Sequence, residues 1–205
     1  MKNNIYDPWI GKDFKNQKIK TLIVGDSIYN WADKEKLKNP KYIADELINW
    51  FIKNNNKQFE RNLVKTFIGN KNDKDKIERF WNSIAFTEYL NQIMDNANSK
   101  RNYNDYFQNS ENLISTIKEL MPDYVIILGF GTKHDKMSAI KKKLGVKKSV
   151  NYEKISGSIP ESFDVNIGKK SIKFINIRHT SQGYSWNKWN EFLSTNFPEL
   201  VKNYS

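Results

Sequence analysis

Apolar residues follow two kinds of pattern along this chain. Segments 18–24, 124–128 and 171–177 are short and mostly apolar, and 124–128 is continuous, as in strands of a buried parallel sheet. Segments 45–54 and 110–120 repeat apolar residues every three or four positions, which predicts amphipathic helices. Further helices are predicted at 61–68, 134–144 and 186–192, loops at 70–76, 94–106 and 149–168, and either a strand or a helix at the aromatic-rich segment 80–90.

This alternation of strands and helices predicts an α/β fold. We expect a three-layer α/β/α sandwich with a central, mainly parallel sheet of about four strands. A chain of 205 residues is long enough to bury a full core, and it contains no internal repeat or linker. Residues 1–205 are therefore interpreted as a single domain.

Parallel sheets bind their ligands beyond the carboxyl ends of the strands. The side chains expected there are the carboxylates Asp26 and Glu88, the hydroxyl of Ser27 and the imidazole of His179, with Gly129 closing one of the strands. We therefore expect these residues to surround one site.

Composition excludes several kinds of chemistry. The chain has no cysteine, so it has no disulfide, no Cys-ligated zinc and no thiol nucleophile. Its two histidines argue against a His-rich metal site, and neither metal-ligand spacing nor a phosphate-binding P-loop is present, so no metal or cofactor is predicted. The sequence shows neither an apolar signal-peptide core nor an apolar run approaching a membrane span of about 20 residues. We expect a cytoplasmic, monomeric protein without membrane contact.

The formal charge of +11 comes mostly from lysine, with 30 Lys and four Arg. Enrichment in Lys and Asn together also follows from an AT-rich coding sequence, so a solvated Lys-rich surface is one interpretation. The other is a surface that binds a polyanion such as nucleic acid. The densest basic clusters are 141–143 and 147–148.

Four motifs, in order, resemble the uracil-DNA glycosylase superfamily, and in particular a branch whose first motif is typically G-E-S-H-Y. In their place the chain has G-D-S-I-Y at 25–29, the aromatic block F-W-N-S-I-A-F-T-E-Y at 80–89, P-D-Y-V-I-I-L-G at 122–129 and H-T-S at 179–181. The resemblance covers about residues 18 to 195. It implies hydrolysis of the N-glycosidic bond of a damaged or modified pyrimidine in DNA, without a metal.

The resemblance also assigns roles to residues. Asp26 is the expected carboxylate that orients water or stabilises the cationic sugar, and His179 the donor to the departing base. Thr180 replaces the proline of the last motif. Contacts with DNA are expected from Ser27, Gly129 and Ser181, and the wedge that fills the vacated base stack from Gln182 or Tyr184.

Glu88 stands where the related branch usually has an asparagine that reads the pyrimidine edge. An ionised carboxylate only accepts hydrogen bonds, so it favours an exocyclic amine such as cytosine N4 over uracil O4. The sequence thus predicts a preference for cytosine derivatives. Asn82 or Asn91 are alternative readers, and the aromatic floor of the base pocket is expected from Tyr29, Phe59 or Phe86.

Two other functions stay open. Strand-Gly25-Asp26-Ser27 also resembles the nucleophile block of SGNH-type (GDSL) esterases, with Ser27 as nucleophile and His179 as base. Their third block would fall at 131–135 without its Asn, and in their last block Asn176 replaces the Asp that a serine hydrolase needs to orient its histidine. A non-catalytic DNA-binding protein on the glycosylase-like fold is the third possibility.

Overall fold

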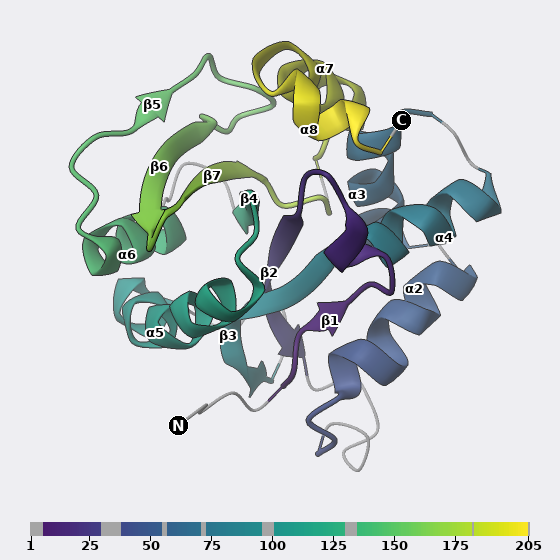
Figure 1. The fold of residues 1–205 in the computed structure, drawn as a ribbon, viewed down its shortest axis with the longest axis horizontal. Coiled ribbons are helices and arrows are strands. Elements are labelled where there is room, and N and C mark those ends of the chain that lie inside the picture. Colours follow the sequence, from purple (N-terminus) through teal and green to yellow (C-terminus); the bar gives the residue numbers. More distant parts are fainter. Residues whose placement is uncertain are drawn as a thin grey trace.

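A computed structural model gives the fold of the chain (Figure 1). It describes residues 6–29, 38–54, 57–70, 73–95, 101–129, 135–181 and 183–204, without the side chains of residues 44, 45 and 91.

These residues form a seven-stranded sheet in the order β1-β3-β2-β4-β7-β6-β5. Strands β3, β2, β4 and β7 are parallel, whereas β1, β6 and β5 add antiparallel edges. The α/β class predicted from the sequence is confirmed, but the sheet is larger than the four strands expected. The strands are β1 (Trp9–Ile10), β2 (Thr21–Tyr29), β3 (Ala85–Met94), β4 (Tyr124–Gly129), β5 (Val150–Asn151), β6 (Glu161–Ile167) and β7 (Lys170–Arg178).

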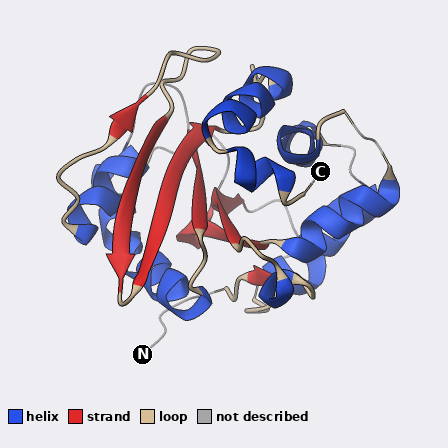
Figure 2. Ribbon diagram, turned by 45° about the horizontal axis from the view of Figure 1, so that its top comes forward, coloured by secondary structure: helices blue, strands red, loops and turns tan. Residues whose placement is uncertain are grey.

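Helices cover both faces of the sheet, as Figure 2 shows. One buried cluster joins Ile23, Phe86 and Ile126 of the sheet to α2, α3, α4, α7 and α8. The other joins Leu22, Val24 and Val125, which point the opposite way, to α5 and α6. The helices are α2 (Ile48–Asn54, after the π-helical turn η2, Ile43–Leu47), α3 (Gln58–Ile68), α4 (Lys74–Ser83), α5 (Tyr103–Leu120), α6 (Asp135–Leu144), α7 (Trp186–Asn196) and α8 (Pro198–Lys202), with a 3-10 turn η1 at Phe14–Asn16.

Several predicted boundaries were wrong. The motif at 25–29 lies inside β2, not in a loop after it, and α5 begins within the predicted loop 94–106. The aromatic block is divided, because α4 continues to Ser83 and β3 begins at Ala85. The predicted loop 149–168 contains β5 and β6, whose polar residues alternate with apolar ones because β6 is partly exposed.

The chain reverses its direction of winding at β2. From β2 it passes to β3 on one side, and β4 then returns to the other side of β2. The carboxyl ends of β2, β3 and β4 therefore meet where an open α/β sheet most often binds its ligand. Among the described residues, no helix combines the length and the apolar character needed to cross a bilayer.

Candidate functional site

Asp26 and Glu88 reach the carboxyl end of the sheet from opposite faces. Glu88 pairs in register with Gly25, the residue before Asp26. Because side chains alternate along a strand, Glu88 lies on the face covered by α3, and Asp26 lies on the face covered by α5 and α6. The strand register thus places the two carboxylates on adjacent strands but on opposite faces of the sheet, at the point where the winding reverses.

Asp26 is the centre of a buried ion-pair network. Its Oδ1 accepts hydrogen bonds from Lys136 Nζ at 2.8 Å and from the Tyr106 hydroxyl at 3.0 Å, and its Oδ2 lies 3.1 Å from Arg101 Nε. Burial alone would raise the pKa of Asp26, but the two cations and the hydrogen bonds hold it below its usual value. Asp26 is therefore ionised at neutral pH.

This network changes the role expected for Asp26. Its side chain is only 1% exposed and is already contacted by three donor groups, so it presents no open carboxylate to a water molecule. Instead it fixes two cations. Lys136 also donates to the carbonyl of Leu128 at 2.6 Å and lies 3.5 Å from that of Gly25, which ties the ends of β4 and β2 together.

Glu88 is in the opposite electrostatic state. Its Oε2 is buried and accepts no hydrogen bond from the residues that the structure describes. Burial, and secondly the charge of Asp26, raise the pKa of Glu88 to about 8, against the opposing effect of Lys136 and Arg101. At pH 7 the Glu88 carboxyl is therefore mainly protonated. The ionised Glu88 assumed from the sequence, and the cytosine preference deduced from it, lose their physical basis.

Gly25 makes room for this carboxyl. A Cβ atom at Gly25 would lie 2.1 Å from Glu88 Oε2, well inside van der Waals contact. We therefore expect Gly25→Ala to lower the free energy of unfolding by about 1–3 kcal/mol, measured by urea denaturation. In a Glu88→Ala background the same substitution should cost much less, since the clashing group is gone. Equal costs in the two backgrounds would contradict this contact.

His179 follows β7 and faces the ring of Phe59 on α3. The two ring centroids are 5.2 Å apart, and the backbone N–H of His179 donates to the carbonyl of Gly129. Burial, and secondly the charge of Lys136, lower the pKa of His179 to about 3, so the imidazole is neutral at pH 7. Its Nδ1 lies 2.9 Å from Ser181 Oγ and accepts a long hydrogen bond, 3.4 Å, from Ser181 N–H. Because Nδ1 accepts this hydrogen bond, the imidazole favours the tautomer with its proton on Nε2.

The loop that carries His179 is anchored to α3. Thr180 Oγ1 donates to the carbonyl of Phe59 at 3.0 Å, and Asn62 Nδ2 donates to the carbonyl of Thr180 at 2.8 Å. Thr180 is completely buried. These two bonds fix the segment that a proline stiffens in the related branch, so the threonine is compatible with a rigid loop.

Two residues predicted to contact the base lie elsewhere. Asn82 belongs to α4 and precedes β3, so it lies at the amino end of the sheet, opposite Asp26. Its carbonyl accepts from Asp13 N–H there. Phe86 is fully buried between the rings of Trp81 and Phe59. Asn82 is thus no base reader, and Phe86 is core beneath Phe59. Asn91 has no described side chain.

The other aromatic candidates are engaged in the structure. Tyr29 ends β2, and its hydroxyl accepts from Arg101 Nη2 at 2.9 Å. Tyr184 stacks on Trp189 with its hydroxyl 2.8 Å from Thr66 Oγ1, a packed position that does not suit a wedge. Phe59, partly buried beside His179, is the aromatic ring best placed for a base.

Of the predicted DNA contacts, Ser181 lies beside His179 and is half-buried. Gly129 ends β4, where a Cβ would lie 2.6 Å from Asn176 Oδ1. Ser27 is buried inside β2 and pairs with Leu90, instead of lying on the exposed turn expected of an esterase nucleophile. Gln182 lies outside the described residues.

The basic cluster 141–143 lies about one to two turns farther along α6 than Lys136. Lys136 in the first turn of α6 reaches the carboxyl ends of the strands, and the helix runs on for about 1.5 Å per residue. Lys141 pairs with Glu161 and Lys143 with Glu111, and Lys143 Nζ also lies 4.3 Å from the centre of the Phe107 ring. These lysines therefore stabilise the outer surface of α6.

Neither Lys136 nor Arg101 was among the site residues predicted from the sequence. Lys136 belongs to a lysine-rich helix, so its sequence context did not distinguish it. Among the lysines that the structure describes in α6, it is the only buried one. Tyr106 lay in a predicted loop. An apolar spacing that includes Tyr106, Leu113 and Ile117 was the signal for a longer helix.

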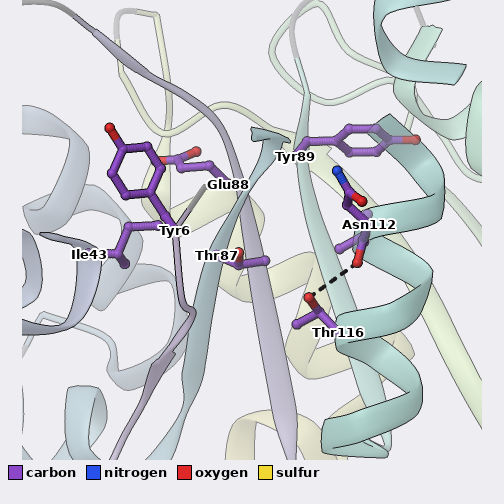
Figure 3. Close-up of a pocket in the computed structure, with 8 residues that line it drawn as sticks. Tyr6, Ile43, Thr87, Glu88, Tyr89, Asn112 and Thr116 are labelled. Atoms are coloured by element: carbon purple, nitrogen blue, oxygen red, sulfur yellow. Dashed lines mark hydrogen bonds between the residues drawn. The ribbon is translucent and has the colours of Figure 1, made fainter. Parts of the chain in front are cut away.

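A pocket lies along the outer edge of β3, where β1 pairs only with Ala85 and Phe86. Figure 3 shows Glu88 and Tyr6 on one side of this strand and Tyr89 directed toward α5 on the other. The pocket shares Glu88 with the charged cluster and is otherwise lined by Tyr6, Ile43, Thr87, Tyr89, Asn112, Leu113 and Thr116.

No protein-family model matches the chain, and no curated protein matches it significantly. Within the described residues, no group of three His, Asp or Glu side chains is arranged to hold a metal ion. The functional assignment therefore depends on the residues of the site and on the motif resemblance.

Proposed function

We propose that the chain is a DNA glycosylase that hydrolyses the N-glycosidic bond of a damaged or modified pyrimidine. The observation that carries the proposal is the position of Asp26, Glu88 and His179: Asp26 and Glu88 lie within β2 and β3, near the level at which β4 and β7 end, and His179 follows β7. The order of the four motifs and the aromatic block at 80–89 support it independently.

The charges suit the departure of an anionic base. As the glycosidic bond breaks, negative charge grows on the base and positive charge on the sugar. Lys136 and Arg101 outnumber the single ionised carboxylate of Asp26, so the cluster has an excess of positive charge. Preorganised donors and cations in a water-poor site stabilise developing negative charge without reorganising.

His179, Phe59 and Asp26 divide the remaining tasks. The neutral imidazole of His179 donates through Nε2 to an oxygen of the leaving base, and the ring of Phe59 stacks on the extruded base. Asp26 acts as a positioning residue for the two cations.

Base release from oligonucleotides tests the proposal. The substrates carry uracil, hypoxanthine, cytosine, 5-hydroxymethylcytosine or glycosylated cytosine, and the products are identified by mass spectrometry. We expect release of a pyrimidine, and its loss in the variant His179→Ala. Salt-sensitive DNA binding without release of any base would favour a binding protein. Labelling of Ser27 by a fluorophosphonate would favour an esterase instead.

A further inference from the structure

The carboxyl group of Glu88 is poised to bind something the protein does not supply. Its Oε2 is buried, lies directly over the Cα of Gly25, and has no hydrogen-bond partner among the described residues. A buried polar atom left unpaired costs about 1–3 kcal/mol, so such atoms usually have a partner in the functional complex. Glu88 also adjoins the pocket at the edge of β3 (Figure 3).

The groups that face Glu88 favour its uncharged form. Burial has the largest effect, and Asp26 on the adjacent strand repels a second negative charge. Lys136 and Arg101 act in the opposite direction, but both already contact Asp26 directly. The charged or titratable groups around Glu88 are Asp26 and Tyr29 on β2, Lys136 on α6, Arg101 before α5 and Tyr6 before β1.

A neutral carboxyl offers one donor and one acceptor on neighbouring oxygens. The edge of uracil around position 3 offers N3–H and O4, and that of cytosine offers N3 and the N4 amine, so each edge pairs one donor with one acceptor. A neutral carboxyl complements both edges, because either of its two oxygens can carry the proton. An ionised carboxylate complements only groups that donate.

We propose that Glu88 reads the edge of an extruded pyrimidine as a neutral carboxylic acid, so that the site takes both uracil-type and cytosine-type bases at neutral pH. This inference rests on the proposed glycosylase function and names its substrate class. It replaces the cytosine preference that an ionised Glu88 would give.

The protonation of Glu88 is measured without any substrate. The full chain, labelled with ¹³C at the glutamate side-chain carboxyls, is titrated by NMR, and the Glu88→Gln variant identifies the Glu88 signal. We expect a midpoint near pH 8. A midpoint near the ordinary value of 4.5 would overturn the inference, whatever the activity of the protein.

Base selectivity is the second test. Release of uracil relative to cytosine is compared at pH 6.5 and pH 9.0 in the wild type and in Glu88→Gln. With a carboxyl that titrates near pH 8, the neutral fraction falls about tenfold between these values, and the ratio should fall about as much. Glutamine keeps a donor and an acceptor without titrating, so its ratio corrects for the titration of uracil itself. Identical pH dependence in the two proteins would overturn the inference.

Failure of the glycosylase function would be recognised separately. If neither base is released at either pH, binding of deoxyuridine and deoxycytidine is followed through the Glu88 NMR signal. A shift with both nucleosides at pH 6.5 supports the neutral reader in a binding protein. A shift with neither overturns it.

Discussion

Replacing Asp26 with asparagine is expected to lower the free energy of unfolding by about 3–5 kcal/mol, because it leaves Lys136 and Arg101 buried without a counter-charge. The matched control is Asp164→Asn. Asp164 also pairs with a lysine at 2.8 Å, but its side chain is 55% exposed, so its loss should cost less than about 1 kcal/mol. Urea denaturation at pH 7 measures both variants.

A second substitution separates charge from shape. The double variant Asp26→Asn/Lys136→Met removes one of the two unpaired buried cations and should be more stable than Asp26→Asn alone.

The stability of the protein should also depend on pH through Asp26. Because the pKa of Asp26 is lowered in the folded protein, its stabilising effect is present above pH 3.8 and is lost as the pH falls through the lower folded value. Equal stability of Asp26→Asn and Asp164→Asn would show that the buried network contributes nothing.

The single variant Asp26→Asn should also release the base at least about a hundredfold more slowly than the wild type. The loss is expected even in the fraction that folds, because the positions of Lys136 and Arg101 depend on Asp26. Circular dichroism establishes how much of the variant is folded in the assay. Full base release by folded Asp26→Asn would remove Asp26 and its two cations from the mechanism.

The pairing of parallel strands explains why part of the site was predictable. Apolar runs locate the strands, and the residues that end them must meet at one edge of the sheet. This reasoning indicated Asp26, Glu88 and His179 without any knowledge of the register, although β2 and β3 continue past Asp26 and Glu88 and only β4 and β7 end near them. It rests on backbone geometry alone, which is why it succeeded for residues on strands.

Helical residues of the site obey no comparable rule. Lys136 is one of 30 lysines, and only its position in the first turn of α6, directly over the ends of β4 and β2, distinguishes it. The predicted position of Asn82 beside the base was wrong for a related reason. Aromatic residues in 80–90 pack equally well from a helix or a strand, so the pattern could not reveal that α4 ends at Ser83 and leaves Asn82 at the wrong end of the sheet.

The protonation states of Glu88 and His179 could not be predicted from the sequence either. The state of Glu88 depends on its burial and on Asp26 from the neighbouring strand, and both follow from the register of β2 against β3. A sequence supplies the residue type and its ordinary pKa, from which an ionised Glu88 was the natural assumption. The neutral state of His179 likewise follows from its burial and from Lys136.

Replacing His179 with alanine is expected to lower kcat for base release by about 10²–10³ and to change KM little, because a donor to the leaving base acts mainly in the transition state. Ser181→Ala should have a smaller effect. It keeps the imidazole and removes only the hydroxyl that helps to set its tautomer. Equal loss in the two variants would show that His179 acts through the structure of the loop.

The pH profile distinguishes a neutral donor from a cationic one. The folded pKa of His179 is about 3, so wild-type base release should show no titration between pH 5 and pH 7. The same shift affects stability. Because the pKa lies below its unfolded value of 6.5, the contribution of His179 to folding is present above pH 6.5 and is lost as the pH falls toward 3. Base release that rises below pH 6.5 in the wild type, and not in His179→Ala, would instead identify the imidazolium as the catalytic donor.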